Sequence, residues 1–125
     1  MATILVIDDD HFFTELVSLH LLLAGHTVQV AKDPEEGLRA IINTPPDLIL
    51  LDLDLPYLSG FEVLEALRSD AATREVPVIM LTAQKDEESY ARCDRAGIDG
   101  FLTKPLQSDK LTEAIAAALA AHAQE

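Results

Sequence analysis

Basic side chains are scarce in this chain of 125 residues. Nine Lys and Arg stand against 22 Asp and Glu, so the formal net charge is −13 and the pI is near 4.4. Binding to nucleic-acid backbones or to anionic membrane surfaces depends on clustered Lys and Arg that neutralise phosphates. Because the sequence has no basic cluster, we expect no direct nucleic-acid binding and no membrane binding.

Cysteine is nearly absent too, with Cys93 as its single representative. One cysteine excludes an internal disulfide and a cysteine-based zinc site of the usual ligand count. No apolar stretch reaches about 18 residues, the length of a membrane-spanning helix, and the N-terminus has no basic leader. We therefore expect a cytoplasmic protein, and the length predicts a single domain over residues 1–125.

Five short apolar runs alternate with five longer helical patterns, an order typical of repeated βα units and a parallel sheet. Most runs are apolar throughout, as expected for strands that helices cover on both faces. The predicted class is therefore α/β, with a doubly wound sheet. The five predicted strands cover residues 4–7, 27–31, 48–51, 76–81 and 100–103.

Capping residues mark the predicted helix starts. Asp33 and Glu36 form one capping box and Ser59 and Glu62 form another. Gly25 and Gly97 are expected to end two helices. The first helix is expected over residues 10–24, and we expect the following apolar residues, which crowd one of its sides, to belong to the core: Phe13, Leu16, Val17, Leu19 and Leu23.

Four of the five predicted strands end on a polar or charged residue. In open α/β sheets, ligands bind outside the carboxyl ends of the strands, so these side chains are expected to share one site. They are Asp8 and Asp9 after the first strand, Asp52 after the third, Thr82 after the fourth and Lys104 after the fifth.

Three carboxylates brought together at this edge would repel one another. At an effective dielectric constant of about 20, each close pair costs on the order of 3 to 4 kcal/mol. Mg²⁺ suits a site of a few carboxylates, and Lys104 would complete the charge balance. A carboxylate beside Mg²⁺ is a competent nucleophile toward phosphorus, and Asp52 is the best candidate. Lys104 and the Thr82 hydroxyl would then neutralise charge on the phosphoryl oxygens.

With these residues in place, the sequence resembles the receiver domains of two-component response regulators over essentially its whole length. The resemblance implies a flavodoxin-like fold with strand order 2-1-3-4-5 and five helices on both faces. Gly60, which closes the loop after Asp52, belongs to the pattern. The motifs that carry it are ILVIDDD at 4–10, DLILLDLDLP at 47–56, VPVIMLTA at 76–83 and FLTKPL at 101–106.

The resemblance implies that Asp52 accepts a phosphoryl group from a sensor histidine kinase or a histidine phosphotransfer protein. The implied Mg²⁺ ligands are Asp8, Asp9, Asp52 and the main-chain carbonyl of Asp54. Thr82 and Phe101 would form a switch pair that changes the surface offered by the fourth helix, fifth strand and fifth helix to an effector in cis or in trans. Such a protein is not a classical enzyme but a phosphoacceptor that assists its own phosphorylation and dephosphorylation, either as a stand-alone receiver or as one excised from a larger protein.

Two positions next to this site lead to a separate hypothesis. Asp54 and Gln84 are expected to overlook the phosphoryl group and to set the lifetime of the phosphoaspartate, in a direction that the sequence leaves open. Asp52 and Asp54 also form a DxD that resembles the haloacid dehalogenase-like phosphatases, although the acid pair then lies on the wrong side of the nucleophile and the chain is short for a substrate cap. A phosphorylation-independent interaction module on the same fold is the third alternative.

Overall fold

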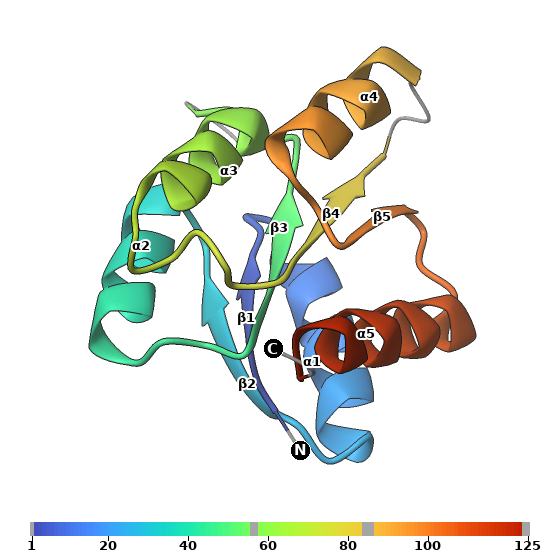
Figure 1. Cartoon of the computed structure of the whole chain (residues 1–125). Coiled ribbons are helices and arrows are strands. Elements are labelled where there is room, and N and C mark those ends of the chain that lie inside the picture. Colours follow the sequence, from blue (N-terminus) through green and yellow to red (C-terminus); the bar gives the residue numbers. More distant parts are fainter. Residues whose placement is uncertain (1, 56–57, 84–86, 124–125) are drawn as a thin grey trace.

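The structure is a computed structural model, and it describes residues 2–55, 58–83 and 87–123. Strands and helices alternate along the chain from first to last, as the apolar runs predict (Figure 1). The elements are β1 (Thr3–Ile7), α1 (His11–Leu23), β2 (Thr27–Ala31), α2 (Pro34–Asn43), β3 (Leu48–Asp52), α3 (Gly60–Ser69), β4 (Val78–Thr82), α4 (Glu87–Ala96), β5 (Gly100–Thr103) and α5 (Ser108–Ala123).

The five strands form one parallel sheet in the order β2-β1-β3-β4-β5, which confirms the predicted topology. Helices α2, α3 and α4 pack on one face, and α1 and α5 pack on the other (Figure 1). The connections change face between β1 and β3, so the carboxyl ends of these two strands border a crevice of the kind in which doubly wound sheets bind ligands.

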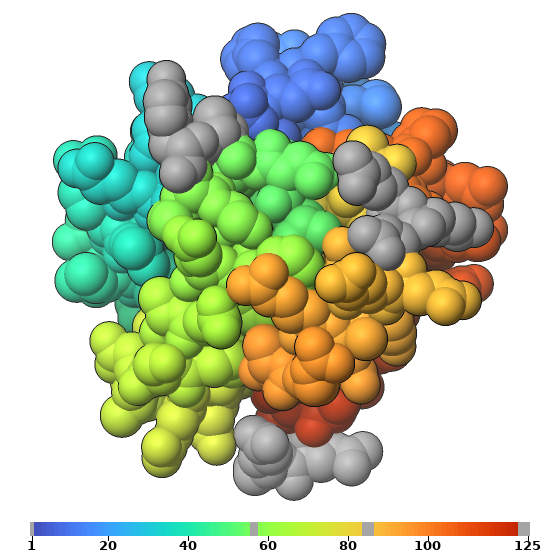
Figure 2. Space-filling model, turned by 90° about the horizontal axis from the view of Figure 1, so that it is seen from above, coloured from blue at the N-terminus to red at the C-terminus, as the bar shows by residue number. Residues whose placement is uncertain are grey.

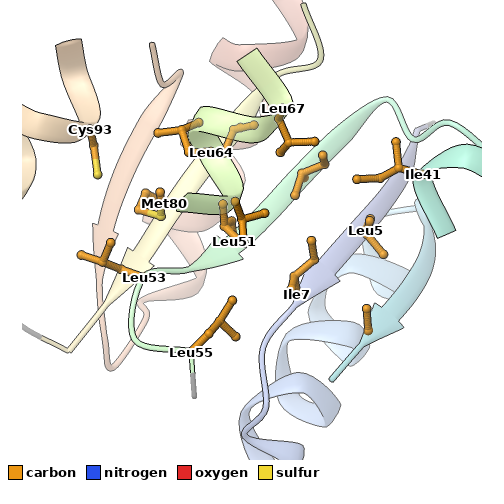
Figure 3. Close-up of a cluster of buried hydrophobic side chains, with 14 residues drawn as sticks. Leu5, Ile7, Ile41, Leu51, Leu53, Leu55, Leu64, Leu67, Met80 and Cys93 are labelled. Atoms are coloured by element: carbon orange, nitrogen blue, oxygen red, sulfur yellow. The ribbon is translucent and has the colours of Figure 1, made fainter. Parts of the chain in front are cut away.

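Successive residues of the three central strands enter two different cores. In β1, Leu5 and Ile7 belong to the cluster beneath α2, α3 and α4, whereas Ile4 and Val6 belong to the cluster beneath α1 and α5. Figure 3 shows the first cluster, in which Leu64 from α3 lies against the sheet. Since both faces are covered, the interior positions of these strands are apolar, which explains the continuous apolar runs. Polar side chains occur only at strand ends, as with Thr3, Asp52 and Thr82.

The predicted N-caps form, and the largest shift at a strand boundary lies at the start of the fourth strand. Asp33 accepts a hydrogen bond from the Glu36 amide (2.8 Å), and the Ser59 hydroxyl accepts one from Phe61 (3.2 Å). The fourth strand begins at Val78, two residues later than predicted. It follows Pro77, which has no N–H for the sheet.

The prediction that the leucine-rich side of α1 is core is wrong in part. Leu16, Leu19 and Leu23 are 50%, 54% and 79% exposed, and the buried residues of the helix are Thr14, Val17 and Leu21. Apolar residues surround most of α1, but a helix that packs on a sheet buries only one side. In α1 the buried side is the row Thr14, Val17 and Leu21, at spacing i, i+3, i+7. Within the described part of the chain, no helix has the length and hydropathy needed to cross a membrane.

Candidate functional site

Three carboxylates gather where β1 and β3 end. Asp8, Asp9 and Asp52 each place an oxygen within 4.8 Å of the others. Asp8 and Asp52 are buried and Asp9 is exposed, so the cluster opens toward solvent on one side. Figure 2 looks onto this edge of the sheet, where the start of α1 (blue), the segment after β3 (green) and the end of β4 (yellow) meet. The grouping predicted from the strand ends is therefore confirmed.

Asp8 is fixed by contacts on both carboxylate oxygens. Its Oδ1 accepts a hydrogen bond from the Asp10 amide (2.9 Å), and its Oδ2 accepts one from Lys104 Nζ (2.8 Å). Asp10 in turn caps α1 by accepting from the Phe13 amide (3.1 Å). The turn from β1 into α1 thus holds a buried carboxylate in one orientation.

Asp52 is held at the end of the central strand by backbone contacts around it. The Leu53 amide donates to the Leu81 carbonyl of β4 (2.7 Å), and the Gly60 amide donates to the Leu53 carbonyl (3.0 Å). A Cβ at position 60 would lie 2.6 Å from the Asp52 carbonyl oxygen, so only glycine allows α3 to begin this close to the strand end. The Gly60 of the sequence motif therefore has a steric role.

Lys104 reaches the cluster from the position directly after β5. Its Nζ lies 2.8 Å from Asp8 Oδ2, 3.8 Å from Asp52 Oδ1 and 4.2 Å from the centre of the Phe13 ring. The Lys104 side chain is only 19% exposed, and its backbone amide donates to the Thr82 carbonyl (2.8 Å). The ammonium is therefore positioned between two acids and an aromatic face that attracts cations. The contact with Phe13 has no signal in the sequence, where Phe13 is indistinguishable from a core residue.

Burial raises the pKa of the Asp52 carboxyl from 3.8 to about 6. The next largest effect is the hydrogen bond from the Asp54 amide (3.1 Å), which lowers this pKa. The charges of Asp8 and Asp54 raise the pKa, and the charge of Lys104 lowers it. Neighbouring acids and low solvent access thus disfavour the ionised form of this carboxyl, as expected in a site that a cation completes.

The Thr82 hydroxyl has an acidic partner that the sequence did not predict. It donates to Asp54 Oδ2 (3.0 Å), and the Ala83 amide donates to the same oxygen (3.3 Å). Thr82 is fully buried, whereas Asp54 is exposed. Asp54 therefore lies over the end of β4, beside the site. Gln84, predicted with Asp54 to influence the phosphoryl group, lies outside the described residues.

Phe101, the predicted partner of Thr82, lies on β5 and is half-buried. Its ring meets the ring of Tyr90 from α4 edge to face, with centroids 5.3 Å apart. Both rings line a hollow of about 650 Å³ between α4, β5 and the start of α5, to which Leu106 and Lys110 also contribute. A movement of Phe101 would therefore alter this surface.

The three carboxylates fit a hard divalent cation. Mg²⁺ takes oxygen ligands and is commonly held by one or two carboxylates, with waters and phosphate oxygens completing its shell. Asp8, Asp9 and Asp52 are the residues that could hold it, and the exposed side of the cluster leaves room for further ligands. The acidic group is of the type found in the Mg²⁺ sites of receiver domains.

Comparison with known proteins defines the class. Residues 4–116 match the response regulator receiver domain family, and the chain belongs to this family. It is 29% identical to a CheY-like response regulator receiver domain protein from Methanospirillum hungatei, with a TM-score of 0.92 over 99% of this chain and 98% of the other.

Two curated relatives illustrate different contexts of the domain. The chain is 40% identical to the DNA-binding dual master transcriptional regulator RpaA of Synechocystis, over 95% of this chain and 49% of RpaA. It is 35% identical to the protein PilH of Pseudomonas aeruginosa, over 96% of this chain and 99% of PilH. The chain spans about half the length of the transcriptional regulators that it matches.

Proposed function

We propose that this receiver domain accepts a phosphoryl group on Asp52 from a phosphohistidine of a sensor histidine kinase or histidine phosphotransfer protein. The observation that carries this proposal is the position of Asp52, which is 3% exposed, has a carboxylate oxygen within 4.8 Å of oxygens of Asp8 and Asp9, and has Lys104 Nζ 3.8 Å from its Oδ1. Receiver domains as a class interact with histidine kinases, which supports the choice of donor.

The proposed step is a displacement at phosphorus. An Asp52 carboxylate oxygen forms the new O–P bond, and the P–N bond to the donor imidazole breaks with its electron pair remaining on nitrogen. Lys104, whose Nζ lies 3.8 Å from Asp52 Oδ1, would neutralise charge on the transferring group. The Thr82 hydroxyl and the Ala83 amide, which donate to Asp54 Oδ2 in this structure, would donate to the phosphoryl oxygens.

Bound Mg²⁺ would supply charge neutralisation for the acids and for the incoming phosphoryl oxygens. Asp8, Asp9 and Asp52 would hold it, with the main-chain carbonyl of Asp54 as a further ligand. Before the cation binds, Lys104 is the cation that contacts Asp8 and lies close to Asp52.

The output is a changed surface on α4, β5 and α5. Phosphorylation adds a charge of about −1.5 to −2 at neutral pH, toward which Thr82 is drawn. Phe101 follows into the space that Thr82 leaves, and the hollow lined by Phe101 and Tyr90 changes shape for an effector in cis or in trans. With beryllofluoride and Mg²⁺, the largest NMR shifts away from the acid cluster are expected at Tyr90 and Phe101.

Phosphorylation is tested with acetyl phosphate or phosphoramidate and Mg²⁺, followed by intact-mass spectrometry. The wild-type chain is expected to gain one phosphoryl group, and Asp52→Asn none. Asp94→Asn is the matched control, because Asp94 is an exposed acid on α4, and it should be phosphorylated as the wild type is. Phosphorylation of Asp52→Asn, or none of the wild type, would refute the assignment.

The same preparations separate the two alternatives. Repeated turnover of p-nitrophenyl phosphate would indicate a phosphatase of the haloacid dehalogenase type. The geometry gives this little support, since the Asp54 carboxylate that would act as the acid/base is hydrogen-bonded to Thr82 and Ala83. Partner binding that is unchanged in Asp52→Asn and insensitive to beryllofluoride would indicate a phosphorylation-independent module.

A further inference from the structure

The Asp54 carboxylate has a position that its sequence context does not explain. Its Oδ2 accepts hydrogen bonds from the Thr82 hydroxyl (3.0 Å) and from the Ala83 amide (3.3 Å). The amide of the same residue donates to Asp52 Oδ1 (3.1 Å). Asp54 therefore contacts the nucleophile candidate through its backbone and the end of β4 through its side chain.

The two donors at the end of β4 lie next to Asp52. The strands β3 and β4 pair with Asp52 opposite Leu81, so Thr82 and Ala83 follow directly beyond the paired position. A phosphoryl group on Asp52 would present three strong acceptor oxygens on this side of the site. A hydroxyl has one hydrogen to donate, and a backbone amide has one. The carboxylate of Asp54 and a phosphoryl oxygen are therefore competing acceptors for the same two hydrogens.

Charge adds to this competition. Asp54 is a fourth acid beside Asp8, Asp9 and Asp52, and Lys104 already contacts Asp8. A phosphoryl group on Asp52 would bring further negative charge next to the Asp54 carboxylate. Both the limited number of donors and the like charge favour release of Asp54 when Asp52 is phosphorylated.

We propose that the Asp54 carboxylate is an internal competitor of the phosphoryl group, bound to Thr82 and Ala83 in the unphosphorylated protein and displaced when Asp52 is phosphorylated. This rests on the proposed function of Asp52. Asp54 acts here as a positioning residue, since it holds the Thr82 hydroxyl until the phosphoryl oxygens replace it. The competition lowers the affinity of the site for a phosphoryl group and biases the domain toward its unphosphorylated state.

The test is the affinity for beryllofluoride, measured by fluorine NMR with Mg²⁺ in excess. Asp54→Ala removes the competing carboxylate and keeps the main-chain carbonyl, and it is expected to bind the analogue roughly tenfold more tightly than the wild type. Asp94→Ala removes one exposed acid elsewhere on the surface and is expected to leave the affinity unchanged.

A double-mutant cycle with Thr82→Val separates competition from simple repulsion. Thr82→Val removes the hydroxyl for which the Asp54 carboxylate and a phosphoryl oxygen would compete. Asp54→Ala should therefore improve binding much less in the Thr82→Val background. An undiminished improvement there, or no improvement in the wild-type background, would overturn the proposal. If the wild type and Asp54→Ala both failed to bind the analogue, the function of Asp52 itself would be wrong, and this inference with it.

Discussion

Replacing Asp52 by asparagine is expected to stabilise the metal-free protein at neutral pH, although it removes the residue on which the proposed function depends. The folded protein raises the pKa of Asp52 from 3.8 to about 6, chiefly through burial. Since one pKa unit corresponds to about 1.4 kcal/mol, ionised Asp52 costs the fold about 3 kcal/mol at pH 7. Asparagine keeps an oxygen for the Asp54 amide and carries no charge, so it avoids this cost.

The pH dependence gives the sign of the effect. A carboxyl whose pKa is higher in the folded than in the unfolded protein does not lower the stability while the pH is below the unfolded pKa. The free energy of unfolding falls as the pH rises from the unfolded pKa to the folded pKa. Relative to Asp52→Asn, the wild type should therefore lose about 3 kcal/mol of unfolding free energy between about pH 4 and pH 6, and stay lower above that range. Urea unfolding in the presence of EDTA, followed by circular dichroism at several pH values, measures the difference.

The control and the metal response make this prediction specific. Asp94→Asn should change the stability by less than about 0.5 kcal/mol at any of these pH values, because Asp94 is exposed. Mg²⁺ should stabilise the wild type and narrow its gap to Asp52→Asn, since the cation relieves the repulsion of a charged carboxylate cluster. If the metal-free Asp52→Asn variant were equal to or less stable than the wild type at neutral pH, the reasoning from burial and charge would be refuted.

Other substitutions test neighbouring contacts. Lys104→Met leaves the buried Asp8 carboxylate without its ammonium and should lower the unfolding free energy by about 3 kcal/mol in urea titrations, whereas the exposed Lys110→Met should not. Phe13→Leu should cost about 1 kcal/mol through the lost cation–π contact, and a cost that persists in the Lys104→Met background would contradict this origin. Burial raises the pKa of the Cys93 thiol from 9.0 to about 11, so iodoacetamide should modify it slowly in the native state and rapidly in urea. Because the thiol ionises more easily in the unfolded chain, the free energy of unfolding should fall as the pH rises above 9.0.

Much of the fold was predictable because both faces of the sheet are covered. The strands read as apolar runs, and the helices between them carry recognisable caps at Asp33 and Ser59. The buried side of α1 was not predictable in the same way. Apolar residues surround that helix, so periodicity alone does not distinguish the buried Val17 and Leu21 from the exposed Leu19.

In the candidate site, the features that depend on the backbone were predictable, and those that depend on side-chain orientation were not. The rule that ligands bind at the carboxyl ends of parallel strands brought Asp8, Asp9 and Asp52 together from sequence position alone. The aromatic contact of Lys104 depends on which direction Phe13 faces, and the Thr82 hydrogen bond depends on a rotamer of Asp54. Neither follows from residue type or spacing, so neither could be predicted.

The hydrogen bonds inside the site bear on the energetics of the proposed switch. The donors that would receive the phosphoryl oxygens already have internal acceptors: Lys104 bonds Asp8, Thr82 and Ala83 bond Asp54, and the Asp54 amide bonds Asp52. Phosphorylation would therefore exchange acceptors instead of adding hydrogen bonds to unsatisfied donors. The net free energy of such an exchange is much smaller than the gross strength of the bonds. A small net difference means that the free energies of the two proposed states are close. One phosphoryl group can then shift the equilibrium between them, and its loss can reverse the shift.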